Sequence, residues 1–80
     1  MTEKDKQNNL RNKFGKAVRR RRLKAGLSQE DFAEQAAIHR TYVSSVELGK
    51  VDTGIYVAYR MAKALKTSLS NLIREVEENM

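Results

Sequence analysis

The sequence predicts an all-α protein built from five short helices. Apolar side chains recur at three- and four-residue intervals in five separate stretches, which is the spacing of one helix face. The chain has no proline to interrupt a helix, and it has only four glycines. Glycine, serine and threonine residues stand at the breaks between the stretches, where they are typical of helix ends and helix starts.

The first helix is expected over roughly residues 11–25. Gly26 ends it as a C-cap. Residues 1–9 have no apolar side chain after Met1, so we expect a flexible N-terminal arm or a frayed extension of the helix. The structured domain is therefore expected over residues 10–78. The apolar stripe of the first helix consists of Leu10, Phe14, Val18 and Ala25.

Two shorter helices are expected next, over roughly residues 29–36 and 40–48. Ser28 is a good N-cap for the first of them, and Asp31 places a favourable negative charge in its first turn. Gly49 ends the second helix. A break of about three residues separates the two.

The remaining chain predicts a loop and two more helices. Residues 49–54 contain two glycines and turn-forming Asp and Thr, which indicates a loop. A fourth helix follows over roughly residues 55–65. The fifth is expected over roughly residues 69–78, with Thr67 or Ser68 as its N-cap.

The small size of the chain favours a dimer. A domain of this length buries only about 60% of its unfolded surface, so its core alone stabilises it weakly. The sequence has no cysteine, which excludes a disulfide and a thiolate metal site. Oligomerisation is the usual remaining source of stability.

The net charge of +6 lies entirely in the first half of the chain. Residues 1–40 carry eleven Lys and Arg against five Asp and Glu, whereas residues 41–80 carry five of each. A basic half indicates an anionic partner, either nucleic acid or a membrane surface, although on charge alone a role in solubility is equally expected. No apolar stretch approaches the roughly 20 residues that span a bilayer, and no signal segment is present, so we expect a cytoplasmic protein without membrane contact.

The second and third helices predict a helix-turn-helix. A link of about three residues cannot bring the third helix back antiparallel, so the pair is expected to cross steeply. If Val43, Val46 and Glu47 face the core, the 100° step per residue turns another set of side chains outward. That outer set is Arg40, Thr41, Ser44, Ser45 and Leu48.

The outer face suits the reading of DNA bases. The N-terminal part of a recognition helix reaches base edges in the major groove. Arg40 is suited to guanine O6 and N7 as a bidentate pair, worth about 1–3 kcal/mol of discrimination. The hydroxyls of Thr41, Ser44 and Ser45 are suited to bases or phosphates. The alternative is an ordinary solvated helix face.

The stretch LSQEDFAEQAAIHRTYVSSVELGK, residues 27–50, resembles the helix-turn-helix of the phage-repressor and Cro-like (XRE-type) regulators. The segments MAKAL (61–65) and SLSNLI (68–73) also resemble the family's closing helices, so the likeness covers about residues 14–73. It implies a five-helix lambda-repressor-like DNA-binding domain. Within the family, the RTYVS run at 40–44 and the short length are most similar to controller proteins of restriction–modification systems.

The resemblance implies further DNA contacts. Gln29, at the start of the second helix, is expected to bind a phosphate, as is Lys50 just after the third. Tyr42 is expected to touch a phosphate or a flanking base. Independently of the resemblance, the position of His39 indicates a DNA contact or a turn residue. Arg19 in the arginine run is a further candidate for the DNA backbone, although a solvated face is the more expected role for any single arginine of the run.

The resemblance also implies a structural ion pair between Arg22 and Glu47, tying the first helix to the third. Three departures from the family pattern stand out. Ala37 replaces a glycine in the turn, so a left-handed backbone there is expected to be strained. His39 replaces the usual serine N-cap, which weakens the cap, and Lys66 replaces the glycine that closes the fourth helix.

The fifth helix has two interpretations. Its apolar stripe either covers the core or meets a second copy of the chain, and we expect a shared role. A dimer reads two half-sites about 34 Å apart, which one helix alone cannot do. The expected interface residues are Leu72, Ile73 and Val76.

The sequence thus predicts a homodimeric transcriptional regulator that binds a palindromic operator in double-stranded DNA, one that controls a restriction–modification operon if the finer likeness holds. The alternative is an antitoxin-like module that binds a toxin protein and its own promoter. An enzyme is not expected, because His39 is the only histidine and no glycine-rich phosphate loop is present. No metal, cofactor or small-molecule substrate is expected either.

Overall fold

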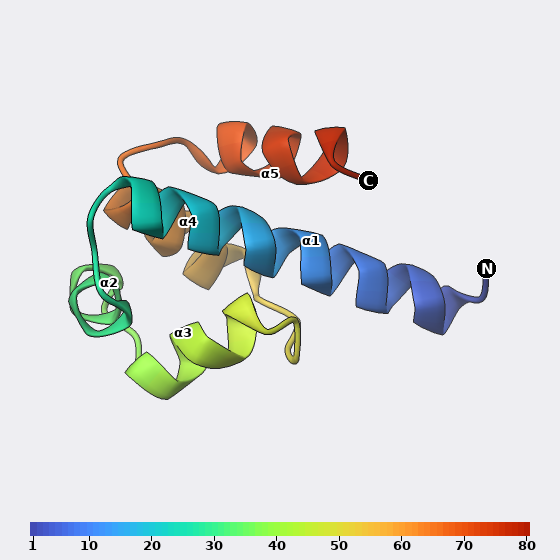
Figure 1. Cartoon of the computed structure of the whole chain (residues 1–80), viewed down its shortest axis with the longest axis horizontal. Helices are drawn as coiled ribbons and strands as arrows, with labels where there is room; N and C mark the ends of the chain where they lie inside the picture. Colours follow the sequence, from blue (N-terminus) through green and yellow to red (C-terminus); the bar gives the residue numbers. More distant parts are fainter.

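The computed structural model describes all 80 residues and contains five helices joined by short loops (Figure 1). The predicted all-α fold is confirmed. Every predicted helix boundary lies within one residue of the observed one, except the start of the first helix. None of the helices is both long enough and apolar enough to cross a membrane. The helices are α1 (Glu3–Lys24), α2 (Gln29–Ala36), α3 (Arg40–Glu47), α4 (Ile55–Ala64) and α5 (Leu69–Glu78).

The predicted start of α1 near residue 11 is wrong, because the helix begins at Glu3. Thr2 Oγ1 accepts the Asp5 backbone N–H at 3.1 Å, and the Asp5 carboxylate accepts the Thr2 N–H at 3.1 Å. This reciprocal capping box starts a helix without any apolar residue. The hydrogen bond from the Thr2 N–H, followed by one that Thr2 Oγ1 donates to the same carboxylate at 2.9 Å, holds the pKa of Asp5 below its usual value. Residues 3–9 thus form turns of α1 that project beyond the other helices (Figure 1).

The core lies where the five helices meet. α1 packs against both α3 and α5, which flank it in Figure 1, and α4 packs against α2 and α5. Phe32 and Met61 are the largest side chains in the core, and both are fully buried. The core cluster consists of Ala17, Val18, Phe32, Ala33, Ala36, Val43, Val46, Met61, Ala62, Leu65, Leu72 and Val76.

Four of the helices end in the same C-terminal motif. In each, the chain leaves the helix through one residue with a positive φ, and the next N–H bonds a carbonyl five residues back. Gly26 and Gly49 occupy this position after α1 and α3, where glycine adopts the conformation freely. The same position is taken by Ala37 after α2 (φ 58°) and by Lys66 near the end of α4 (φ 59°). Both have a Cβ, so the left-handed conformation is unfavourable for them. Ala37 thus keeps the left-handed backbone that the glycine of the family pattern adopts, where alanine is strained.

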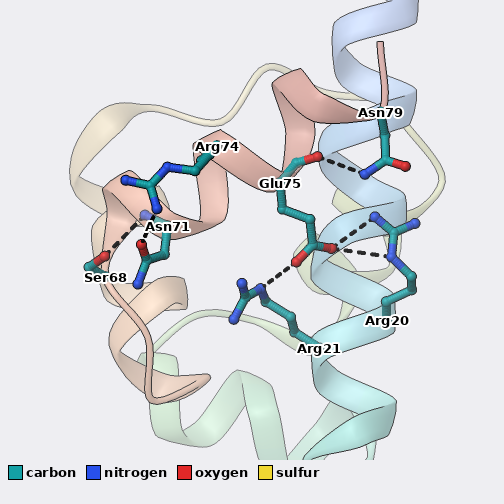
Figure 2. Close-up of polar contacts among 7 residues, drawn as sticks. All are labelled: Arg20, Arg21, Ser68, Asn71, Arg74, Glu75 and Asn79. Carbon is teal, nitrogen blue, oxygen red and sulfur yellow. Dashed lines mark hydrogen bonds and ion pairs between the residues drawn. The ribbon is translucent and has the colours of Figure 1, made fainter.

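Ion pairs fasten α5 onto α1. The Glu75 carboxylate lies between Arg20 and Arg21 (Figure 2). Glu75 Oε2 accepts from Arg20 Nη2 at 2.8 Å, and Oε1 accepts from Arg21 Nε at 2.8 Å. Because these bonds join residues more than 50 positions apart, they fix the C-terminal helix against the first one. Two arginines of the basic run are thereby engaged within the chain.

Candidate nucleic-acid interface

α3 is anchored to the core by one face. Val43 and Val46 are at most 1% exposed, and Glu47 is also buried, so the predicted inner face is confirmed. α2 packs against α3 across the short link formed by Ala37, Ile38 and His39. Ala33 and Ala36 are buried on α2, and their small side chains permit the close approach of a steeply crossed pair.

The opposite face of α3 is open to solvent. Arg40 and Thr41 are exposed at its N-terminus, and Ser44 and Ser45 are half-buried one turn later. Arg40 belongs to none of the five ion pairs of the chain. The face therefore presents a free guanidinium and three hydroxyls on a helix whose other side is fixed in the core.

The N-terminus of α3 attracts anions. His39 is the N-cap residue, but its side chain makes no capping hydrogen bond, and no acidic residue stands in the first turn. The N–H groups of Arg40 and Thr41 are consequently unpaired and carry the positive end of the helix dipole, whereas the Tyr42 N–H bonds the His39 carbonyl at 3.0 Å. The exposed His39 imidazole and Arg40 guanidinium lie beside these amides in the sequence.

A buried network joins the first three helices. Arg22 Nε and Nη2 donate to the two carboxylate oxygens of Glu47 at 2.7 and 3.0 Å. Arg22 Nη1 also donates to the Leu27 carbonyl at 2.8 Å. Gln29 Nε2 donates to Glu47 Oε1 at 3.1 Å, a bond that the sequence did not indicate. The structure thus brings Arg22 and Glu47 together and adds Gln29 to them.

Gln29 keeps hydrogen-bond donors that are free to bind a ligand. Gln29 is the first residue of α2, so its backbone N–H has no partner within the helix. Its side-chain amide has two hydrogens, and the bond to Glu47 uses one of them. Both the remaining hydrogen and the helix dipole favour a phosphate at this place, whereas Glu30 and Asp31 in the same turn oppose it.

The other predicted backbone contacts lie around α3 or on α1. Lys50 is exposed directly after Gly49, at the C-terminal end of α3. Tyr42 is half-buried and packs partly against the core. Arg19 is exposed on α1 and belongs to no ion pair.

A second network, which is exposed, supports the loop after α3. Arg11 Nε and Nη2 donate to Asp52 at 2.7 and 3.0 Å, and Gln7 Nε2 donates to Asp52 at 2.8 Å. The hydrogen bond from Arg11 is the main reason that the pKa of Asp52 lies below its usual value. No local pattern indicates these bonds, because the partners are more than 40 residues apart. They tie the N-terminal turns of α1 to the loop that leaves α3.

Two of the three predicted dimer residues are wrong. Leu72 is fully buried and Val76 is 1% exposed within a single chain, so neither has surface left for a second copy. The apolar stripe of α5 is used mainly against α1 and α4. Ile73 alone remains accessible, at 37%.

An apolar groove of about 300 Å³ lies beside Ile73. Its walls come from α1, the loop after α3, the start of α4, and α5. Its most exposed apolar side chains are Ile55 at 80% and Leu10 at 49%. No three His, Cys, Asp or Glu side chains gather in the chain as a metal site would require.

Comparison with known proteins agrees with this geometry. Residues 18–72 match the family model described as helix-turn-helix. The control protein C.MunI from Mycoplasma sp is 35% identical over 72 residues, which is 89% of this chain and 97% of that protein.

Two solved structures extend the comparison. The restriction-modification controller protein C.AhdI from Aeromonas hydrophila has a TM-score of 0.76 and 34% identity, over 78% of this chain and 94% of that chain. The controller protein C.Esp1396I, solved as a tetramer in complex with its natural 35 base-pair operator, has a TM-score of 0.74 and 29% identity. The match covers 85% of this chain and 95% of that one. The chain therefore belongs to the helix-turn-helix family and, within it, to the control proteins that include C.MunI.

Proposed function

We propose that the chain is a sequence-specific regulator of transcription that binds double-stranded DNA as a homodimer on a palindromic operator. The observation that carries this proposal is the outer face of α3, where an unpaired Arg40 and three hydroxyls stand on a helix fixed by its other side. Kinship with control proteins supports control of a restriction–modification operon. It gives no support to the antitoxin-like alternative. A regulator of bacterial transcription acts beside the DNA, in the cytoplasm, and needs no catalytic centre.

The contacts divide into two groups with different consequences. Arg40, Thr41, Ser44 and Ser45 are proposed to read base edges in the major groove. The second group is proposed to bind the phosphate backbone, which supplies affinity without sequence information. Its members are Gln29, Tyr42, Lys50, His39 and Arg19.

The proposal is tested by selecting bound sequences from a random pool of DNA duplexes with the purified protein at moderate salt. An enriched inverted repeat supports a dimeric, sequence-reading regulator. Binding that weakens with salt but enriches no sequence contradicts it, because phosphate contacts alone produce that behaviour.

Arg40→Ala is expected to weaken binding to the enriched duplex by about 5- to 150-fold for each half-site, because a bidentate arginine–guanine contact is worth about 1–3 kcal/mol. Binding to a random duplex of equal length should change by about twofold or less. Titrations followed by fluorescence anisotropy measure both affinities.

Lys50→Ala provides the comparison. It removes one proposed phosphate contact from each copy of the homodimer, so both duplexes should lose affinity about equally, and the magnitude of the slope of log K against log salt should fall by about 2. Equal losses on both duplexes for Arg40→Ala would contradict a base-reading role.

We further propose that the groove around Leu10, Ile55 and Ile73 is where the second copy docks. The loop residues that line it (51–53) lie four to six residues after the end of α3, so a twofold pair joined there has its two recognition helices on either side of the axis. The longest dimension of one chain, 36 Å, is comparable with the roughly 34 Å between half-sites.

The charges beside the groove suit a second copy. Lys6, which pairs with Glu3 at 3.2 Å on the exposed surface of α1, precedes Leu10 by one helical turn, and Glu77 follows Ile73 by one turn on α5. A twofold pairing that sets α1 of one copy against α5 of the other brings opposite charges together at the rim.

Ile55→Glu is expected to convert the dimer to a monomer at micromolar concentration, because it places a charge in an apolar contact. Sedimentation velocity measures the change. Leu23→Glu is the matched control, since Leu23 is an exposed leucine, at 55%, outside the groove. A dimer that survives Ile55→Glu, or one that dissociates equally in both variants, would refute this interface.

A further inference from the structure

The turn between α2 and α3 contains a backbone conformation that its residue does not favour. Ala37 has φ 58° and ψ 47°, the left-handed region that glycine adopts freely and alanine avoids. The Ala37 N–H bonds the Glu34 carbonyl at 3.1 Å, and the Ile38 N–H bonds the Ala33 carbonyl at 2.9 Å. The second bond exists only while Ala37 keeps this conformation, because φ and ψ of Ala37 set the direction of the Ile38 N–H.

A side chain from α4 holds the same residue. Arg60 Nη2 donates to the Ala37 carbonyl at 3.1 Å. The Arg60 guanidinium also lies over the Tyr56 ring, with Cζ 5.0 Å from the ring centroid. Arg60 Nε is buried and has no hydrogen-bond partner, so the group is held at some cost in solvation.

This contact lies in the turn that leads directly into α3. The direction of the Ala37 carbonyl is set by ψ of Ala37, so a donor fixed on that oxygen stabilises the left-handed state. Only Ile38 lies between Ala37 and His39, the N-cap of α3. Any rotation at Ala37 therefore changes the angle at which α3 leaves the turn.

We infer that Arg60, braced on Tyr56, is a positioning residue for α3 and takes the place of the glycine that the turn lacks. Its effect on DNA binding rests on the function proposed above, whereas its effect on the turn does not.

The first test measures the turn in the free protein. Arg60→Met keeps the aliphatic stem and removes the donor, so amide hydrogen exchange at Ile38, followed by NMR, should become about tenfold faster. Lys63→Met is the matched control, because Lys63 lies over the Tyr59 ring on the same helix, 5.3 Å from its centroid, without reaching the turn. It should leave the exchange rate within about twofold of that of the native protein.

The second test restores the turn without the arginine. Ala37→Gly makes the left-handed state favourable by itself, so in the Arg60→Met background it should bring Ile38 exchange back to within about threefold of the native rate. On the enriched duplex, Arg60→Met should bind about three- to tenfold more weakly, with a smaller loss on random DNA, and Ala37→Gly should restore the affinity.

Each failure has its own meaning. Unchanged exchange at Ile38 in Arg60→Met overturns the inference. An affinity loss that Ala37→Gly does not restore, and that is equal on both duplexes, also overturns it, because Arg60 then acts as a charge on the DNA backbone. If the native protein enriches no sequence, the proposed function fails while the exchange measurements still decide the role of Arg60.

Discussion

Arg22→Met is expected to lower the free energy of unfolding by about 3–5 kcal/mol. The substitution leaves the Glu47 carboxylate, whose side chain is 2% exposed, buried without its main partner. A domain of this size has a total stability of about 4–12 kcal/mol, so the loss is a large part of it. Urea denaturation followed by circular dichroism measures the change.

An exposed pair of the same geometry provides the control. Arg11 donates to Asp52 at 2.7 and 3.0 Å, the distances found for Arg22 and Glu47, but the Asp52 side chain is 62% exposed. Arg11→Met should therefore cost at most about 1 kcal/mol. If Arg22→Met costs no more than Arg11→Met, burial does not govern the Arg22–Glu47 pair.

The double variant separates stability from function. Arg22→Met with Glu47→Leu replaces the ion pair by apolar groups, and it should recover most of the lost stability. Its affinity for operator DNA should stay low, because Gln29 loses the acceptor that orients its side chain. Full recovery of both properties would show that the network does not position Gln29.

The order of the helices and the inner face of α3 were predictable because both depend on local patterns. Helical spacing placed Val43 and Val46 in the core, and Ala37 marked a left-handed turn without glycine. The start of α1 was predictable as well, since Thr2 and Asp5 have the spacing of a capping box. The spacing of apolar side chains does not show this start, because residues 3–9 have none.

The partner of an apolar stripe was not predictable. The spacing of Leu72, Ile73 and Val76 shows that α5 has an apolar face, but it does not show whether that face meets its own core or another chain. Polar contacts between distant residues have no local pattern either. Gln29–Glu47 and Arg60–Ala37 join residues 18 and 23 positions apart, and only the packing of the helices brings them together.

Gly15→Ala is the prediction in which two effects of opposite sign compete. Within a helix, alanine is favoured over glycine by about 1 kcal/mol, so helix propensity alone predicts a more stable protein. Gly15, however, is buried where α1 crosses the end of α3. A Cβ there would overlap the Val46 carbonyl oxygen and lie 2.8 Å from that of Glu47.

Backbone atoms cannot rotate away as a side chain does, so α3 must move off α1. We expect a net loss of about 2–3 kcal/mol in the free energy of unfolding, measured by urea denaturation, with the steric cost exceeding the gain in propensity. Affinity for the enriched duplex should fall as well, because the displaced helix is the one that carries Arg40.

Gly54→Ser is the matched control for Gly15→Ala. Gly54 is the N-cap of α4, a Cβ there meets nothing within 4 Å, and serine is favoured at an N-cap. This variant should be as stable as the native protein or slightly more so. If Gly15→Ala proves equally harmless, α1 and α3 are not in backbone contact at this crossing, and Gly15 does not determine how closely the recognition helix packs.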